Sequence, residues 1–359
     1  MAFDLEKLFI DVFAPRCGDV VTIMYDLPHG EIRDCKEWRL RREMASAWQR
    51  KLEESASRHG FTVNPIVTYR ATGAHNSDLP SDVMSQGQAA RLEDIINGST
   101  IILSMPEYSA SAPLFMLTKR YEHLRVASMP GVTKSMEDTG LAANYQNIAA
   151  TCKRLAGLFE RAVGVEVLFS TGHTCNFDLS SHKRPFRDDG MLPPDAGKDA
   201  DRLRNLPSGE VGVCPNEAGD SRTAGEIPAV LGSEDIVFIV KNNKIVDVTG
   251  TGPIAERMRA GFRREPALCN IAEVAIGCND KAAVTGNVLE DEKAGFHWAY
   301  GRSEFLGGTV GPRHFSSPER VCHQDIVYAK GNPVVCRRFD FVFPDGSRQT
   351  AIADGALIV

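Results

Sequence analysis

A histidine and an aspartate two residues apart are the clearest sign of chemistry in the sequence. Residues 322–326 read CHQDI, with His323 and Asp325 on either side of one glutamine. Side chains two residues apart point to the same face of a β-strand, so a strand here presents an imidazole and a carboxylate together. The pair predicts a metal site, and the same spacing also occurs on solvated strand faces.

A second candidate lies in residues 289–301, which read LEDEKAGFHWAYG. Three consecutive acids end at Glu292, five residues before His297, and this pattern fits either a metal-binding loop or an acidic surface turn. Aromatic residues alternate with His297 and its neighbours, which predicts a strand with one buried face. His297 then points away from the aromatic side chains of Phe296, Trp298 and Tyr300.

Two further glutamates complete the set of candidate ligands. Glu273 stands between apolar residues in IAEVAIG (271–277). Burying a carboxylate costs several kcal/mol unless it is paired or bound to a cation, so Glu273 predicts either a metal ligand or a salt bridge to an arginine. Glu210 in NLPSGEV (205–211) is by itself compatible with a surface loop.

The order of these segments resembles the aminopeptidase T family of metallopeptidases. The motifs NLPSGEV, AEVAIG, LEDEKAGFHWAYG and CHQDI follow one another over roughly residues 200–330. The resemblance implies a homodimeric metallo-aminopeptidase with two divalent ions (zinc, cobalt or manganese) that cleaves N-terminal residues from short peptides. Carried over by position, the implied metal ligands are Glu210, Glu273, Glu292, His297, His323 and Asp325.

In such a hydrolase, two ions activate a water molecule, and Glu210 or Glu273 is expected to move its proton as the catalytic base. The family usually has a tyrosine seven residues after the third-motif histidine, where this chain has Glu304.

The chain also resembles 2,5-dihydroxypyridine 5,6-dioxygenase, a single-iron branch of the same fold. That branch keeps the closing His-x-Asp pair, but it has a histidine in place of Glu273 and an apolar residue in place of Glu210, so this chain matches the hydrolase ligand set better. The alternative function is a ring-cleaving dioxygenase, in which His297, His323 and Asp325 hold one Fe(II) ion, since two histidines and one carboxylate suit non-haem iron. A non-catalytic binding protein on a decayed enzyme fold is the third hypothesis.

The elements that must position these residues divide into two halves. In the first half, apolar runs at residues 19–25, 61–69, 99–105 and 125–129 alternate with helical patterns at 37–59, 88–96, 111–123 and 133–162. Such alternation predicts a parallel sheet. We therefore expect an α/β protein with a Rossmann-like domain at residues 1–164 and a β-rich α+β metal-binding domain at residues 165–359.

Short strands dominate the second half, including a hairpin with a turn at Asn242–Asn243. The first strand lacks a following GxGxxG, so a dinucleotide role is poorly supported. The helix-borne zinc motif HExxH, the nucleophile elbow GxSxG and the P-loop are also absent from the sequence.

Composition narrows the function classes further. The 359 residues carry 41 Lys and Arg against 47 Asp and Glu, a net charge of −6, which argues against nucleic-acid binding. No apolar run is long enough to span a membrane, and the N-terminus lacks a basic region typical of secretory signals. Nine scattered cysteines without a CxxC pair suit a reducing cytoplasm. We expect a cytoplasmic enzyme that acts on a small molecule or a short peptide.

Overall fold

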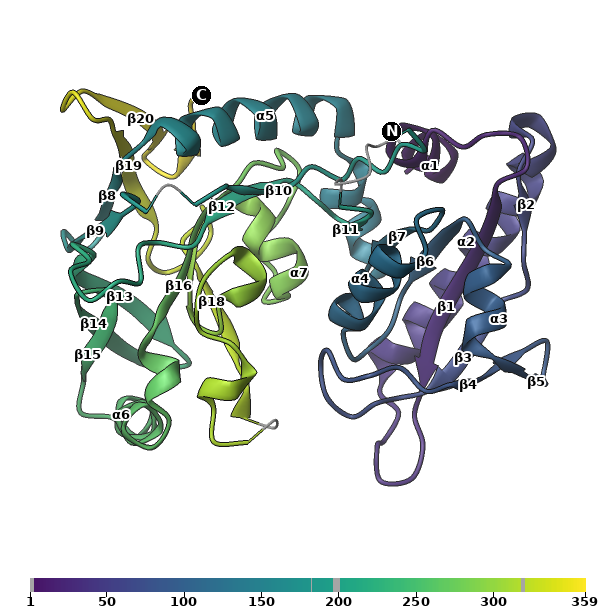
Figure 1. Cartoon of the computed structure of the whole chain (residues 1–359), viewed down its shortest axis with the longest axis horizontal. Helices are drawn as coiled ribbons and strands as arrows, with labels where there is room; N and C mark the ends of the chain where they lie inside the picture. Colours follow the sequence, from purple (N-terminus) through teal and green to yellow (C-terminus); the bar gives the residue numbers. More distant parts are fainter. Residues whose placement is uncertain (1–2, 182, 196–200, 318–319) are drawn as a thin grey trace. The chain divides into compact units, whose positions relative to one another are not determined.

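The computed structural model describes residues 3–181, 183–195, 201–317 and 320–359. The chain divides into two compact units: Met1–Ala149 with Asp188–Ser208, and Ala150–Arg187 with Gly209–Val359. This division differs from the single boundary expected at residue 164, because the chain returns to the first unit to add a strand to its sheet. Figure 1 labels the helices and strands of both units and colours the chain by residue number.

One sheet with parallel central strands forms the first unit. Its order is β11 (Leu203–Asn205), β7 (Arg125–Ser128), β6 (Ile101–Ser104), β1 (Val20–Leu27), β3 (Val67–Arg70), β4 (Asp82–Ser85) and β5 (Gln88–Arg91), with β2 (Thr62–Val63) beside β1. Pairing is parallel from β11 to β3 and antiparallel from β3 to β5. The expected parallel pairing and the general α/β class are thus confirmed.

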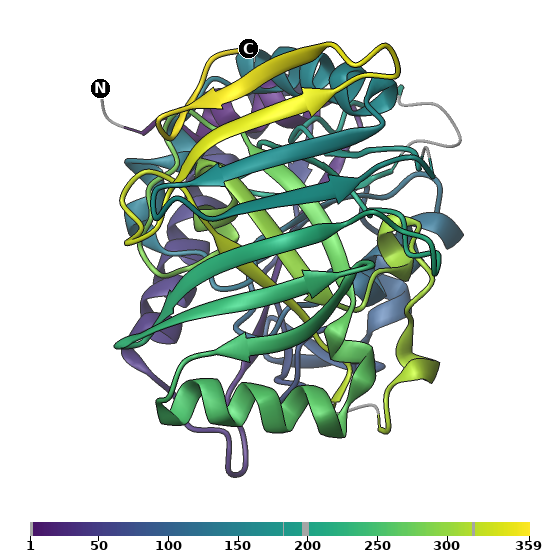
Figure 2. The ribbon, with the colours of Figure 1, turned by 90° about the vertical axis from the view of Figure 1, so that its left-hand side faces the viewer.

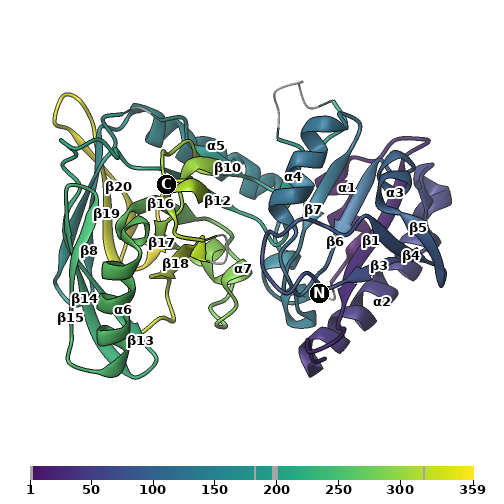
Figure 3. The ribbon, with the colours of Figure 1, turned by 60° about the horizontal axis from the view of Figure 1, so that its bottom comes forward.

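Helices cover both faces of this sheet. They are α1 (Leu5–Phe13), α2 (Lys36–His59), α3 (Leu92–Asn97) and α4 (Ser111–Arg120). Figure 3 shows α2 on one side and α3 and α4 on the other. Met24 and Ile102 of the strands share a buried cluster with Ile96 of α3 and Leu114 of α4, so apolar burial fixes these helices on the sheet.

The helix expected at residues 88–96 is only partly present. Residues Gln88–Arg91 form β5, and α3 begins at Leu92. Gln86 and Gly87, with φ of 50° and 75°, make a two-residue turn between β4 and β5. Positive φ at both positions favours a tight hairpin, so pairing with β4 outweighs the helical preference of the two alanines that follow.

Two antiparallel sheets form the second unit. Figure 2 shows the larger one face on; its order is β15 (Lys244–Thr249), β14 (Glu234–Lys241), β13 (Ala224–Leu231), β9 (Thr174–Asp178), β8 (Gly164–Phe169), β19 (Cys336–Val342), β20 (Arg348–Ala353) and β21 (Ala356–Leu357). The smaller one has the order β10 (Phe186–Asp188), β12 (Glu210–Val213), β16 (Ile271–Gly277), β17 (Phe296–Gly301) and β18 (His323–Val327).

An aromatic layer joins the two sheets. Phe238 of β14 packs against Trp298 of β17 with ring centroids 5.2 Å apart, and Phe339 of β19 packs against Phe296 at 5.6 Å. Aromatic residues of β17 therefore face the larger sheet, and the residues between them, including His297, face the opposite side. The expectation from the alternating pattern is confirmed.

Helices and short turns complete the second unit. The α-helices are α5 (Tyr145–Arg161), which begins in the first unit, α6 (Pro253–Arg264) and α7 (Val288–Asp291). The 3₁₀ turns given by the described parts of the two units are η1 (Lys134–Glu137), η2 (Gly140–Ala142), η3 (Pro266–Cys269), η4 (Glu292–Ala294), η5 (Glu304–Leu306) and η6 (Pro312–His314). The expected hairpin turn is confirmed, with Asn242 and Asn243 at φ of 49° and 61°. None of the helices in the described ranges is long and apolar enough to cross a membrane.

Candidate metal centre

Strand register gathers the candidate ligands on one face of the smaller sheet, the face turned away from the aromatic layer. Residues opposite each other on neighbouring antiparallel strands share a face, as do residues two apart in one strand. The opposed pairs on this face are Glu210 and Gly277, Ala275 and His297, Glu273 and Ala299, Ala299 and Asp325, and Gly301 and His323.

Small residues between the ligands leave room for a cluster on this face. Gly277 is the most restrictive of them, because a Cβ added there would lie 2.2 Å from the main-chain oxygen of Glu292. The main chain of η4 is also held by hydrogen bonds from Asn279 N to Lys293 O (3.0 Å) and from Gly277 N to Gly295 O (2.8 Å). Contact with this glycine therefore sets the position of Glu292 and Lys293.

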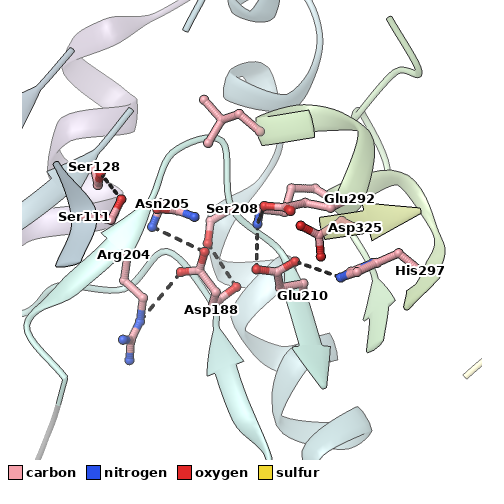
Figure 4. Close-up of polar contacts among 12 residues, drawn as sticks. Ser111, Ser128, Asp188, Arg204, Asn205, Ser208, Glu210, Glu292, His297 and Asp325 are labelled. Atoms are coloured by element: carbon pink, nitrogen blue, oxygen red, sulfur yellow. Dashed lines mark hydrogen bonds and ion pairs between the residues drawn. The ribbon is translucent and has the colours of Figure 1, made fainter. Parts of the chain in front are cut away.

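Carboxylates and imidazoles meet at the centre of the cluster. One ligand atom each from Glu273, His323 and Asp325 lies within 4.8 Å of the others. His323 Nε2 is 3.0 Å from Glu273 Oε2 and 3.4 Å from Asp325 Oδ1. His297 Nε2 lies 3.3 Å from Glu273 Oε1 and 3.4 Å from Glu210 Oε2. Figure 4 shows Glu210, His297 and Asp325 converging.

Main-chain carbonyls orient both histidines. His323 Nδ1 donates to Arg302 O at 2.7 Å, and His297 Nδ1 lies 3.3 Å from Gly295 O. A carbonyl oxygen can only accept a hydrogen bond, so Nδ1 of each ring carries a proton and Nε2 of the neutral ring carries the lone pair. This is the usual arrangement of histidines that bind metal ions.

The carboxylates create a strong negative field at the cluster. Burial would raise the pKa of Glu273, but the imidazoles of His297 and His323 outweigh it and hold that pKa at about 2. Burial would lower the pKa of His297, but Glu273 and its acidic neighbours raise it to about 9. The pKa of His323 is likewise raised by Asp325 and Glu273 against the effect of burial. The cluster therefore favours positive charge.

Lys293 supplies one positive charge from η4. Its Nζ lies 2.6 Å from Glu210 Oε1 and 2.5 Å from Glu292 Oε1, and its side chain is 0% exposed. Burial nevertheless raises the pKa of Glu210 to about 7, because Lys293 offsets it only in part. Burial also raises the pKa of Glu292.

The donor set fits a divalent metal ion. Glu210 Oε2 and His297 Nε2 are buried and, within the described part of the chain, have no partner in hydrogen-bond geometry. Buried polar atoms without a partner are costly; a cation in the cluster would accept the lone pair of His297 Nε2 and balance the charge of Glu210 Oε2. Carboxylates and imidazoles are common ligands of iron, zinc, cobalt and manganese.

The rim of the cluster carries an exposed aromatic ring. Phe305 in η5 is 56% exposed, and its ring centroid lies 5.0 Å from that of His323 in an edge-to-face arrangement. The carboxylate of Glu304, at the position where the aminopeptidase T family usually has tyrosine, is held by Arg302 Nε at 2.8 Å. The chain thus has a carboxylate paired with an arginine at the position where that family has the phenol of a tyrosine.

Glu217 anchors the segment that carries this ring. Its carboxylate accepts hydrogen bonds from Ser303 Oγ (2.5 Å), Thr309 N (2.5 Å) and Asn270 Nδ2 (2.7 Å). Burial would raise the pKa of Glu217, but these donors and the ammonium of Lys183 hold it at about 2. The ionised carboxylate therefore fixes both ends of the segment.

Two cysteine sulfurs lie close to the main chain of β12, the strand of Glu210. Cys152 Sγ of α5 is 3.4 Å from Cys278 Sγ and 3.9 Å from Glu210 O. Cys278 N donates to Gly209 O at 2.7 Å. All nine cysteines lie within the described residues, and none of them is in a disulfide, as expected from their scatter.

The structure brings all six expected ligands into one region. Glu273, His323 and Asp325 meet most closely, His297 and Glu210 adjoin them, and Glu292 is linked through Lys293. Sequence reasoning assigned no role to Lys293, Phe305 or Glu217. A lysine directly after three acids was the one available signal for Lys293; the other two depend on contacts between distant segments.

Comparisons with known proteins support the fold. No protein-family model and no curated protein sequence matches the chain. Among solved structures, 2,5-dihydroxypyridine dioxygenase from Pseudomonas putida KT2440 is similar, with a TM-score of 0.58 and 15% sequence identity over 95% of this chain and 92% of that chain. At this identity the likeness concerns the fold alone, and the comparisons give no support to the aminopeptidase T resemblance.

Proposed function

We propose that the chain is a metal-dependent, ring-cleaving dioxygenase that acts on a small dihydroxylated aromatic compound such as 2,5-dihydroxypyridine, with iron(II) as its metal ion. The observation that carries this proposal is the cluster of Glu273, His323 and Asp325 with His297 beside it. It lies in a fold similar to that of a dioxygenase.

The histidines and Asp325 would hold the ion. Two imidazole nitrogens and one carboxylate form the ligand type that non-haem iron(II) oxygenases prefer, and the carbonyl contacts of both rings direct Nε2 into the cluster. Glu273, between the two rings, would serve as a further ligand or as their charge partner.

A bound iron(II) ion supplies the one-electron chemistry that O₂ needs to react with a closed-shell ring. Both oxygen atoms enter the opened ring, so the reaction needs no external reductant. Glu210, whose carboxylate lies beside His297, would accept the proton of a substrate hydroxyl. The ionised Glu217 would keep the rim segment in place during the reaction.

The rim favours a planar ring as substrate. Phe305 exposes its ring beside His323, and aromatic pairs gain about 0.5–1.5 kcal/mol beyond simple burial. An aromatic substrate would therefore be held against Phe305 with its hydroxyl groups toward the cluster.

A two-metal aminopeptidase is the weaker candidate. Glu210 and Glu292, two of the carboxylates that it would use for metal ions, are already paired with the ammonium of Lys293. Glu304 replaces the tyrosine that this family usually has.

Oxygen uptake tests the proposal directly. Protein purified without oxygen and loaded with iron(II) is expected to consume O₂ when 2,5-dihydroxypyridine is added, and labelled ¹⁸O₂ is expected to place both atoms in the product. Cleavage of amino-acid anilides with cobalt or zinc, in the absence of any oxygen uptake across a panel of dihydroxylated aromatics, would establish the hydrolase in its place.

A matched pair of variants links activity to the cluster. His323→Ala is expected to lower iron content and abolish oxygen uptake. Gln324→Ala changes an exposed neighbour in the same strand, on the opposite face, and should retain both. Equal iron content in the two variants would remove His323 from the ligand set.

A further inference from the structure

Lys293 is a lysine side chain held wholly inside the protein between two carboxylates. Its Nζ contacts Glu210 Oε1 at 2.6 Å and Glu292 Oε1 at 2.5 Å, with 0% of the side chain exposed. Lysine is among the residues least often fully buried, and removing an ammonium from water costs several kcal/mol unless it is matched by opposite charge. A specific electrostatic role therefore explains its position.

The Glu210 carboxylate faces two different positive groups. One oxygen, Oε1, lies on the Lys293 ammonium, and the other, Oε2, points at His297 Nε2 3.4 Å away. A carboxylate that bridges two metal ions would use its oxygens in this divided way, one for each ion. Here an ammonium occupies one of the two positions.

The pairing of Lys293 with two of the four carboxylates favours one metal ion. The cluster contains the four carboxylates of Glu210, Glu273, Glu292 and Asp325, together with Lys293. One divalent ion with the ammonium supplies three positive charges against four negative ones, and two divalent ions with the ammonium supply five, so the total charge is off by one in either case. Two ions would, however, force an ion and the ammonium to share the carboxylates of Glu210 and Glu292.

The backbone keeps the ammonium in this position. The main chain of Glu292 and Lys293 lies directly on Gly277, and Asn279 N donates to Lys293 O at 3.0 Å. Lys293 therefore follows the sheet that carries Glu210 and Glu273, and it cannot move away without disturbing the strand of Glu273.

We infer that the Lys293 ammonium replaces a second metal ion and restricts the site to a single divalent cation held by the Glu273, His297, His323 and Asp325 side. This inference rests on the proposed metal dependence and deepens it by fixing the number of ions. It makes Lys293 a positioning residue, because it acts through Glu210 and Glu292.

Metal counting in the full-length protein tests the inference without any substrate. Chelator-treated protein is titrated with Co²⁺ by calorimetry, and bound cobalt is measured by mass spectrometry after gel filtration. Wild type is expected to bind one ion. Lys293→Ala, which frees Glu210 and Glu292, is expected to bind two, and its melting temperature should rise with Co²⁺ by more than that of wild type. Lys281→Ala, a change at an exposed lysine, should bind one.

Glu292→Gln is a second test variant, which keeps Lys293 and its contact with Glu210. It is expected to bind one ion with unchanged affinity, because Glu292 serves Lys293 and not the ion. If Lys293→Ala does not fold even with Co²⁺, this second variant decides. Two ions in wild type, one ion in a folded Lys293→Ala, or loss of the ion in Glu292→Gln would each overturn the inference.

The outcome is separable from the dioxygenase proposal. Wild type that binds one ion and consumes no O₂ with any dihydroxylated aromatic refutes the proposed reaction and leaves the role of Lys293 intact. Wild type that binds two ions and does consume O₂ overturns the role of Lys293 alone.

Discussion

Replacing Gly277 with alanine should disturb the metal centre without altering any ligand. The added Cβ would lie 2.2 Å from Glu292 O and 2.4 Å from the carbonyl carbon of Lys293. Both neighbours are main chain, so they cannot rotate aside as a flexible side chain could. Restoring ordinary contact distances requires the η4 backbone to move by about 1 Å.

This movement has an energetic and a functional consequence. Inserting a methyl group into a tightly packed site costs about 1–3 kcal/mol. Because η4 carries Lys293, the 2.6 Å contact between its Nζ and Glu210 would lengthen, and Glu210 would turn toward the metal side of the cluster. We expect a lower urea midpoint of unfolding and a weaker or heterogeneous affinity for Co²⁺.

Gly157→Ala in α5 is the matched control. A Cβ there meets no atom within 4 Å, and alanine is favoured over glycine inside a helix by roughly 0.5–1 kcal/mol. This variant should be slightly more stable than wild type, with unchanged Co²⁺ affinity. If Gly277→Ala matched wild type in both stability and Co²⁺ affinity, the packing of η4 on Gly277 would not determine the geometry of the site.

Three further predictions concern the surroundings of the cluster. Phe305→Ala should raise KM for an aromatic substrate roughly three- to tenfold through lost ring contact, with metal content unchanged; an unchanged KM in oxygen-uptake assays would contradict the stacking role. Glu217 has a pKa of about 2 in the folded state, below its ordinary value of 4.5. Its ionised form therefore stabilises the fold by about 3 kcal/mol at most above pH 4.5, and this contribution is lost as the pH falls toward 2. Urea unfolding between pH 7 and pH 3 should therefore show a steeper loss of stability in wild type than in Glu217→Gln, and parallel curves would argue against an ionised Glu217. Hydrogen peroxide should join Cys152 and Cys278, 3.4 Å apart, in a disulfide with release of two water molecules; peptide mapping that finds both thiols reduced while other cysteines are oxidised would exclude it.

Local patterns predicted those parts of the site that depend on a single strand. The two-residue spacing of His323 and Asp325 was enough to predict that both lie on one face of a strand. The alternation of aromatic residues was enough to predict that His297 points away from the aromatic layer. Period-two arguments work here because they follow from strand geometry alone.

The arrangement of the strands could not be derived in the same way. Glu210 and Glu273 lie on one face because β12 pairs with β16, and the strands β13, β14 and β15, the helix α6 and the turn η3 separate these two strands in the sequence. Such pairing depends on long-range packing. The error at residues 88–96 has a related origin, because pairing of Gln88–Arg91 with β4 outweighed the local helical preference.

The role of Lys293 was also invisible to sequence patterns. A lysine after three acids usually lies on a solvated surface, and its burial follows from the contact of η4 with Gly277, which lies 16 residues earlier in the chain. Residue types indicated the chemistry of the cluster, but tertiary packing determined which carboxylates remain available for an ion.

The position of β18 at the end of the smaller sheet has a consequence for the protein without metal. This strand carries two of the candidate ligands and pairs on one side only, with β17, among the described residues. An ion shared by His323, Asp325 and Glu273 would tie this outer strand to its interior neighbours, as metal binding commonly does for folded segments. Loss of the ion would let β18 fray and expose its free edge to other chains, so metal depletion should promote self-association before global unfolding.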